Sequence, residues 1–456
     1  MRRIAFLSPL PPDTSGIADY SAELLPALAR HYEIDLFTEH AGETDSSLAQ
    51  NFALRPLDDF RAADRRRPYS SVVYQIGNGA AHHGGLYRTL LQRPGIVVLH
   101  EYMLHHLMRD LALEKGGKAA FVEDMRYCYG ETGRAMAGRL LHANNLPEMW
   151  TYPLFERVVD AAQGLIVHSR ATRDRVLASR PDTRIAIVPH HLSLHDAAAG
   201  GEKVRDRLRS QVGVDPDAFV VASFGHLNAA KRLDVSLRAF SRFRRSHPQA
   251  VYLLVGEISH ADSELRALLD GELGQGVVTT GRVALDTLLQ HMAHCDVAVN
   301  LRHPTGGETS GACLRLLGLG RAVVVTDAGW FSEIPDECCA KIRPGDDEEA
   351  SLCAVLEALA DREPLRRAMQ ANAARWAGNH HRLDDCARGY AAFIETITSS
   401  EPEAYVAVPP LAPAPPGDVT PALIAEISGA LGDLGFQERD TQMHRAVAVA
   451  LVSLDL

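Results

Sequence analysis

Short runs of apolar, often β-branched residues alternate along this chain with longer amphipathic stretches, and this alternation restricts the possible folds more than any other feature. The runs fall into two series on either side of a polar stretch, residues 195–209. Buried strands separated by helical patterns indicate parallel sheets in layered α/β domains. We predict strands at Ile4–Leu7, Ile34–Phe37, Ser71–Ile76, Ile96–Leu99, Gly164–Val167 and Ile185–Val188 in the first series, and at Phe219–Phe224, Val251–Val255, Val277–Thr280, Val297–Leu301, Ala322–Thr326 and Ala340–Ile342 in the second.

The composition changes toward the end of the chain. After about Asp361 the pattern is helical, and a long helix is predicted over Asp384–Thr398. Residues 401–418 are rich in proline and alanine, which indicates an extended, semi-rigid linker. Residues 419–456 carry helical patterns but are too few for a core of their own. We therefore expect a helical tail that docks on the main body or supports a homo-oligomer.

The charge balance excludes several classes of protein. A formal net charge of −11 argues against a nucleic-acid-binding surface. The seven cysteines lack CxxC spacing and the chain opens directly into a strand, so we expect a cytoplasmic protein with reduced thiols. No apolar run approaches the roughly 20 residues that span a bilayer, so any membrane contact should be peripheral. Arg61 and Arg65–Arg67 could form a basic patch for an anionic lipid or acceptor, although a solvated face explains them more simply.

A glycine-rich turn between two predicted strands carries the strongest chemical signal. It runs from Pro304 to Gly311 and opens a helix. The backbone N–H groups of Thr309, Ser310 and Gly311, at the positive end of the helix dipole, could bind a phosphate. The carboxylate of Glu308 in the same turn would repel phosphate but accept hydrogen bonds from hydroxyls. The combination suggests a site for a sugar phosphate or a nucleotide sugar.

A second loop, from Gly225 to Lys231, follows the first strand of the second series. In a doubly wound sheet, ligands bind beyond the carboxyl ends of the strands, so this loop and the Glu308 turn should face the same crevice. Lys231 would supply a positive charge for a phosphate, and Arg232 could add another. The alternative for Lys231 is an ordinary solvated residue at a helix start.

The first series offers candidates for the same crevice. Ser15-Gly16 should start a helix, and Gly16 would let a ligand approach the backbone closely, although a bare turn is equally consistent. His100 lies at a strand end and could hydrogen-bond a sugar, or could be a packed structural histidine. Asn78 and His82 could approach an acceptor. The segment that begins at His100 is not a zinc HExxH motif because position 104 is leucine.

Together, the Ser15-Gly16-Ile17 opening, the Gly225–Lys231 loop and the Glu308 turn resemble the retaining glycosyltransferases of family four, over roughly residues 1–398. The resemblance implies a GT-B fold, in which two Rossmann-like α/β domains face a central cleft, with a C-terminal helical extension. It implies the following segments: an acceptor domain at 1–200, a nucleotide-sugar domain at 201–375, and helices at 376–400 that return to the first domain.

The resemblance also assigns roles. It implies that Lys231 binds the donor diphosphate, Glu308 contacts the donor sugar and His100 faces that sugar, so these three would be the catalytic group. The remaining donor-binding residues would be Gly16, Gly225, His226, Arg232, Thr309, Ser310 and Gly311, with Asn78 and His82 on the acceptor side.

Two positions depart from the family pattern. His226 stands where family members often have arginine. The second acid of the Glu-x7-Glu motif is absent, because position 316 is leucine, and an alternative alignment places Arg315 there. Recognition of the ribose and base is therefore not carried over, and both GDP- and UDP-linked donors are consistent with the sequence.

The function that follows is transfer of a sugar from a nucleotide-diphosphate sugar to a hydroxyl of a glycan or lipid-linked acceptor, with retention of configuration and no metal or other cofactor. A role in bacterial surface polysaccharide or glycoconjugate synthesis fits. Asp215-Pro216-Asp217 matches Asp-x-Asp but indicates a turn rather than a metal site. One alternative is a non-catalytic sugar-nucleotide-binding subunit that recruits a partner through its tail. Another, a nicotinamide-dependent oxidoreductase, lacks the glycine fingerprint because His82 occupies its third glycine position.

Overall fold

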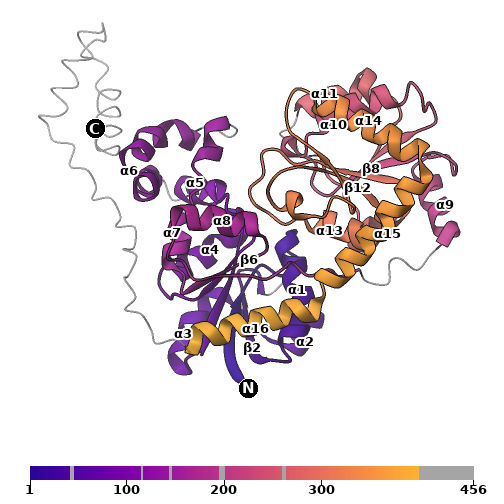
Figure 1. Cartoon of the computed structure of the whole chain (residues 1–456). Coiled ribbons are helices and arrows are strands. Elements are labelled where there is room, and N and C mark those ends of the chain that lie inside the picture. The colour runs from indigo at the N-terminus through magenta and orange to yellow at the C-terminus, as the bar shows by residue number, and fades with distance from the viewer. Residues whose placement is uncertain (42–45, 115–116, 143–145, 195–200, 259–262, 400–456) are drawn as a thin grey trace, which may run out of the picture.

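Two parallel sheets, one in each half of the chain, form the framework of the protein (Figure 1). The computed structural model describes residues 1–41, 46–114, 117–142, 146–194, 201–258 and 263–399. The predicted linker at 401–418 and tail at 419–456 lie outside these described residues. The strands of the first sheet fall between residues 2 and 187, and those of the second between residues 220 and 342.

The first sheet has the strand order β3-β2-β1-β4-β5-β6-β7, with parallel pairing throughout. Its order reverses beside β1, as expected for a doubly wound sheet. The strands are β1 (Arg2–Leu7), β2 (Tyr32–Thr38), β3 (Ala53–Pro56), β4 (Ser71–Ile76), β5 (Ile96–Leu99), β6 (Gly164–Val167) and β7 (Ile185–Ile187). The helices are α1 (Gly16–Leu28), α2 (Ser46–Asn51), α3 (Phe60–Arg66), α4 (Ala80–Leu90), α5 (His105–Glu114), α6 (Lys118–His142), α7 (Glu156–Ala161) and α8 (Arg170–Ser179).

The second sheet is also parallel, with the order β10-β9-β8-β11-β12-β13. Its order reverses between β8 and β11. The strands are β8 (Val220–Phe224), β9 (Val251–Val255), β10 (Val277–Gly281), β11 (Val297–Asn300), β12 (Ala322–Thr326) and β13 (Ala340–Ile342). The helices are α9 (Gly201–Gln211), α10 (Leu233–Phe243), α11 (Ser263–Asp270), α12 (Leu285–His294), α13 (Gly311–Gly318), α14 (Glu348–Asp361) and α15 (Glu363–His380).

The chain returns to the first domain through its last described helix, α16 (Leu383–Ser399). Figure 1 shows α15 against the second domain and α16 running across the first, beside α1. The buried hydroxyl groups of Tyr20 on α1 and Tyr390 on α16 lie 2.8 Å apart and share a hydrogen bond. This helix therefore connects the two domains a second time and is anchored in the core of the first.

All twelve predicted strands are present, with ends within two residues of those expected. In the inner strands of both sheets the apolar, β-branched residues are buried on both faces, which makes these strands predictable from sequence, whereas β7 and β10 are partly exposed. The prediction missed β3, a short edge strand whose residues are exposed or partly exposed. The predicted long helix near the end of the described chain is α16.

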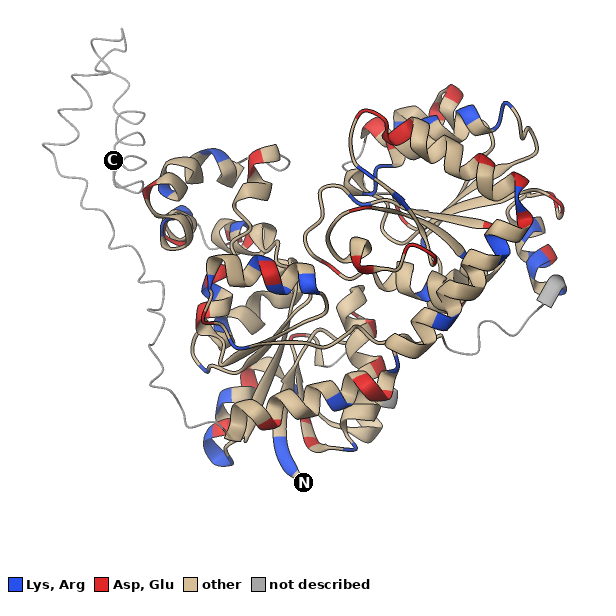
Figure 2. Ribbon diagram, viewed as in Figure 1, with Lys and Arg blue, Asp and Glu red and all other residues tan. Residues whose placement is uncertain are grey.

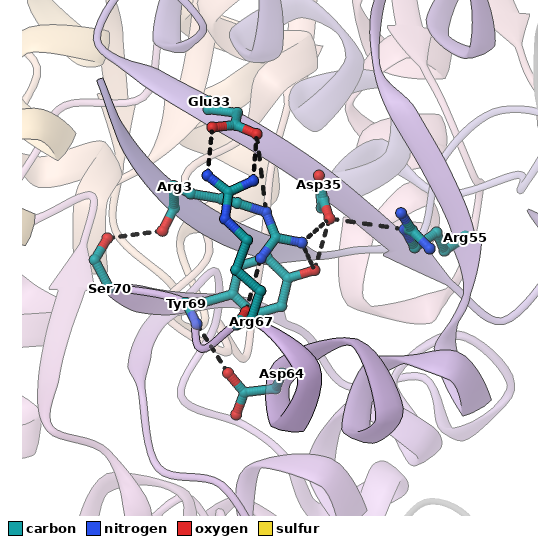
Figure 3. Close-up of polar contacts among 8 residues, drawn as sticks. All are labelled: Arg3, Glu33, Asp35, Arg55, Asp64, Arg67, Tyr69 and Ser70. Atoms are coloured by element: carbon teal, nitrogen blue, oxygen red, sulfur yellow. Dashed lines mark hydrogen bonds and ion pairs between the residues drawn. The ribbon is translucent and has the colours of Figure 1, made fainter.

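Polar contacts at the amino ends of the first strands hold that edge of the sheet together (Figure 3). The guanidinium of Arg3 donates to Asp35 on β2 and to the main-chain oxygen of Arg67, and lies over the ring of Tyr69. The Tyr69 hydroxyl donates to the same Asp35 carboxylate at 2.7 Å. Arg67 in turn pairs with Glu33, so this arginine of the predicted basic patch already has an acidic partner.

Acidic and basic residues are interspersed on the helices of both domains (Figure 2). The exposed Arg61, Arg65 and Arg66 on α3 follow the exposed acids Asp58 and Asp59, so the surface there is mixed in charge. Within the described residues, no helix is both long and apolar enough to cross a membrane.

Candidate active site

The two loops predicted to bind a phosphorylated ligand follow neighbouring strands of the second sheet. β8 and β11 pair in parallel, so their carboxyl ends meet at one edge. The strand order reverses between these two strands. The loop after β8 and the turn after β11 therefore flank the switch point of the sheet, where open α/β folds bind their ligands.

Lys231 is buried rather than solvated, which contradicts the alternative of an ordinary helix-start lysine. It closes a short 3-10 turn, Ala229–Lys231, and its side chain folds back so that Nζ donates to the main-chain oxygen of Phe224 at the end of β8. Burial lowers the pKa of Lys231 to about 7, helped by the nearby Arg302 charge and opposed by Glu308. A bound anion would raise the pKa of this amine again and so favour its charged form.

The rest of this loop is shaped around Lys231. Gly225 has φ of 88°, and a Cβ there would lie 3.2 Å from Nζ of Lys231, so glycine suits both the backbone and the lysine. His226 is exposed. Arg232 binds the buried carboxylate of Glu348 at 2.7 Å, at the start of α14. Nothing in the sequence indicates this partner, which already neutralises the second cation predicted to bind the phosphate.

The Glu308 turn is preorganised by its own contacts. The Glu308 carboxylate pairs with Arg302 at 2.9 Å and accepts hydrogen bonds from the Gly306 N–H and the Thr305 hydroxyl. The Ser310 hydroxyl caps α13 by accepting from the Cys313 N–H at 3.2 Å. Gly311 is the first residue of that helix.

The hydroxyl of Thr309 is buried, and among the described residues it has no hydrogen-bond partner. The turn thus presents a capped helix start together with an unused hydroxyl.

Hydrogen bonds from the first domain reach this turn directly. The Tyr102 N–H donates to the Gly306 oxygen at 2.8 Å, and the Tyr102 hydroxyl donates to the Thr305 oxygen at 3.1 Å. The Thr172 hydroxyl donates to the Gly307 oxygen at 2.8 Å. We call this contact between the loop after β5 and the Glu308 turn the junction. It brings candidate residues of both domains together.

Glu101 directly follows His100 in the loop after β5. Its carboxylate accepts the Asn78 N–H at 3.1 Å. Burial, and after it the neighbouring Glu308 charge, raises the pKa of Glu101 to about 7, against the opposing effects of the Asn78 N–H and Arg302. Asn78 has a structural task as well, because its side-chain oxygen accepts the Leu107 N–H in the first turn of α5.

His100 follows β5 and lies among side chains of the first domain, several of them histidines. Its Nε2 lies 2.7 Å from the side-chain oxygen of Gln75, and its ring lies 4.9 Å from Tyr20 and 5.0 Å from His168. Burial holds the pKa of His100 well below its usual value, so its ring is neutral. The side chain has structural contacts, and the residue keeps part of its surface exposed.

His82 and His83 both lie in the first turn of α4, but only His83 is buried. His82 Nδ1 lies 3.7 Å from the carboxylate of Asp13, which His40 Nδ1 approaches to 2.9 Å. One ligand atom from each of these three residues lies within 4.8 Å of the others. The neighbouring His83, which the sequence offers together with His82 for the acceptor side, is buried, and its Nδ1 lies 3.1 Å from the main-chain oxygen of Gln75.

Gly16 starts α1 behind the cap formed by Ser15, and no atom lies within 4 Å of a Cβ built on it, so the space beside it is open. Seven residues further along α1, Glu23 pairs with Arg315 of α13 at 2.8 Å and with His191 at 3.0 Å. In the alternative alignment, Arg315 occupies the position of the missing second acid. An acid is thus present beside α13, but the first domain supplies it.

The Asp-x-Asp match is a turn, as predicted. The Asp217 N–H donates to the side chain of Asp215 at 2.8 Å, two residues earlier.

Comparisons with known proteins agree with this architecture. The Anabaena protein Alr3699/HepE, solved with UDP-glucose, is 17% identical with a TM-score of 0.60, over 87% of this chain and all of that one. Sucrose-phosphate synthase from Thermosynechococcus elongatus is 15% identical with a TM-score of 0.61, over 87% of this chain and 99% of that one. At such identities the likeness concerns the fold, and it places the chain in the GT-B class of two-domain proteins.

Within that class, residues 218–361 match the family Glycosyl transferases group 1, so the second domain is a glycosyltransferase domain of this group. A curated relative, the D-inositol 3-phosphate glycosyltransferase of Corynebacterium kroppenstedtii, is 24% identical over 256 residues. That match covers 50% of this chain and 54% of the relative, so the chain spans about half of its length.

Proposed function

We propose that this protein transfers a sugar from a nucleotide-diphosphate sugar to an acceptor hydroxyl, with retention of anomeric configuration. The observation that carries the proposal is the pairing of the Lys231 loop and the Glu308 turn at the switch point of the second sheet. One supplies a buried cation and the other a capped helix start with a hydroxyl-binding carboxylate.

The chemistry of the leaving group fits these residues. As the bond from the anomeric carbon to the diphosphate breaks, negative charge grows on the leaving oxygen. In this proposal, Lys231 and the N–H groups at the start of α13 stabilise that charge. The acceptor hydroxyl forms the new bond from the same face, and its proton passes to the departing phosphate. No enzymic nucleophile and no metal ion is needed for this sequence of events.

Two structural neighbours suggest the kind of acceptor and the biosynthetic process. Alr3699/HepE was solved with UDP-glucose, and WaaG, another structural neighbour, is involved in lipopolysaccharide biosynthesis. We propose a UDP- or GDP-linked donor and a glycan or lipid-linked acceptor in bacterial polysaccharide or glycoconjugate synthesis. The transfer would take place in the cytoplasm, with peripheral contact to the membrane when the acceptor is lipid-linked.

The test is a transfer assay with purified protein, a panel of nucleotide sugars and EDTA. We expect nucleoside diphosphate to be released and the product to keep the donor's anomeric configuration in NMR spectra. Lys231→Ala should lower turnover by about a hundredfold or more, as for loss of one oxyanion donor. Lys341→Ala removes a partly buried lysine paired with Asp336 in the same domain and should leave turnover unchanged. An inverted product, or full activity in Lys231→Ala, would refute the proposal.

A second candidate is a non-catalytic subunit that binds a nucleotide sugar. The absence of the second acid favours it, because α13 carries no carboxylate for the ribose and its Arg315 pairs with Glu23 of the first domain. Tight donor binding with neither transfer nor hydrolysis would support this reading.

A further inference from the structure

Three side chains of metal-binding type meet at the carboxyl edge of the first sheet. Asp13 lies in the loop after β1, His40 lies in the turn after β2, and His82 lies in the first turn of α4, which follows β4. The strands β2, β1 and β4 are neighbours in the sheet and run parallel, so the segments that follow them leave from the same edge. The fold thus brings an aspartate and two histidines together from distant parts of the chain.

The spacing of the three ligand atoms suits a metal ion. The Nδ1 atoms of His40 and His82 lie 2.9 Å and 3.7 Å from the same carboxylate oxygen of Asp13. All three atoms lie within 4.8 Å of one another. A tetrahedral zinc ion with bonds of about 2.0–2.2 Å to nitrogen and oxygen holds its ligand atoms about 3.3–3.6 Å apart. The observed distances bracket this spacing, so modest movements of the side chains would complete the site.

Contacts within the protein leave one of the three atoms unused. Nδ1 of His82 is buried and has no hydrogen-bond partner among the described residues, since 3.7 Å to Asp13 is too long for such a bond. Buried polar atoms rarely lack a partner in folded proteins. A hydrogen bond between His40 and Asp13 accounts for that pair without a metal, but it does nothing for His82. The side chains of His40 and His82 are 43% and 29% exposed, which leaves access from the solvent.

Main-chain contacts hold the ligand-bearing segments in place. The carboxylate of Glu39, next to His40, accepts the Gly85 N–H of α4 at 2.7 Å. The turn after β2 is therefore fastened to the helix that follows β4. The Asp13 N–H donates to the Leu10 oxygen at 2.9 Å, which closes the loop after β1. The site needs little rearrangement of the backbone to receive an ion.

We propose that Asp13, His40 and His82 bind one Zn²⁺ ion, which ties the loops after β1 and β2 to the start of α4. Imidazole nitrogens favour zinc and related transition metals, whereas Mg²⁺ and Ca²⁺ prefer oxygen ligands. Three protein ligands leave the fourth position of a tetrahedral ion for a water molecule. The transfer chemistry proposed above uses no metal, so this inference goes beyond it and is tested separately.

The test is calorimetric titration of the whole, untagged chain with ZnCl₂ after metal has been removed by a chelator. We expect one Zn²⁺ per chain with a Kd in the micromolar range or tighter, and about a hundredfold excess of Mg²⁺ should not displace it. Asp13→Asn, His40→Gln and His82→Gln should each weaken binding at least about tenfold, since loss of even an outer partner of a metal site costs that much. Anomalous scattering at the zinc absorption edge should place the ion among these three side chains.

His247→Gln is the matched control. Nε2 of His247 lies 3.0 Å from the carboxylate of Asp361, and within the described part of the chain no third ligand group joins this pair. This variant should bind Zn²⁺ as the wild type does. Thermal unfolding without metal shows whether each variant is folded, and if one of the three is not, the other two carry the comparison.

Absence of stoichiometric Zn²⁺ binding to the wild type would overturn the inference and leave an ordinary His40–Asp13 hydrogen bond. So would an affinity unchanged in the folded variants of the three ligands, or an anomalous peak elsewhere in the molecule. Displacement of Zn²⁺ by Mg²⁺ would contradict the nitrogen ligands. None of these results bears on donor binding by the second domain, so failure of this inference is distinguishable from failure of the proposed function.

Discussion

Replacing Glu101 by glutamine should stabilise the protein more at alkaline than at acid pH. The pKa of Glu101 is raised from 4.5 to about 7, first by burial and then by the Glu308 charge. The folded state therefore binds more protons than the unfolded state between these two values, and stability falls as the pH rises through that window. Glutamine keeps the oxygen that accepts the Asn78 N–H but carries no charge.

The size of this pH dependence follows from the pKa shift of Glu101. One pKa unit is worth about 1.4 kcal/mol, so the ionised carboxylate costs the folded state about 3 kcal/mol at pH 8, where it is charged in both states. At pH 5.5 the folded-state carboxyl is still mostly protonated, and the cost is about 1 kcal/mol. The mutant should thus gain about 2 kcal/mol more at pH 8 than at pH 5.5.

Thermal unfolding at the two pH values measures this difference. For a domain of this size, about 2–4 °C of Tm corresponds to 1 kcal/mol, so the shift should be about 4–8 °C larger at pH 8. Glu23→Gln is the control of opposite sign: burial alone would raise the pKa of Glu23, but His191 and Arg315 lower it. That variant should lose stability at pH 8. A Glu101→Gln shift that is equal at both pH values, or larger at pH 5.5, would refute the reasoning.

Three further predictions concern the site. Donor binding at pH 8 should take up close to one proton, because the pKa of Lys231 is about 7 in the free protein and a bound anion raises it. Calorimetry in buffers of different ionisation enthalpy measures this uptake, and an uptake of zero would contradict the prediction. Gly307→Ala should destabilise the protein by about 1–3 kcal/mol, because φ is 85° and a Cβ would lie 2.3 Å from the Tyr102 ring. Gly378→Ala on α15, where nothing lies within 4 Å, should be neutral or stabilising in the same denaturation experiment. Arg315→Ala and Glu23→Gln, combined in a double-mutant cycle, should show a coupling of about 1–3 kcal/mol, and additive effects would mean that the pair does not couple the domains.

The inner strands of both sheets could be predicted because their side chains are buried on both faces, which leaves an apolar signature in the sequence. The edge strands β7 and β10 are partly exposed but keep enough β-branched residues to be recognised. β3 lacks that signature because it is a short edge strand. The positions of the Lys231 and Glu308 loops followed from topology, since loops after neighbouring parallel strands must share an edge.

The sequence could not indicate which side chains the site residues contact. Nothing near Arg232 in the chain indicates Glu348, which lies 116 residues away. Glu23 is one residue of an ordinary amphipathic helix, and only the meeting of α1 and α13 gives it a role. Between His82 and His83 the sequence offers no criterion, because the start of α4 decides which ring turns inward. Glu101 could have been noticed as an acid directly after His100 at a strand end.

The central claim is that the second domain binds a nucleotide sugar through Lys231 and the Glu308 turn. Calorimetric titration of the wild type, Lys231→Ala and Lys341→Ala with UDP- and GDP-sugars tests it most directly. We predict that one donor binds the wild type and Lys341→Ala equally, and that Lys231→Ala weakens its binding at least tenfold, the loss of about one charged hydrogen bond. Binding that is unchanged in Lys231→Ala, or no binding of any nucleotide sugar to the wild type, would contradict the account.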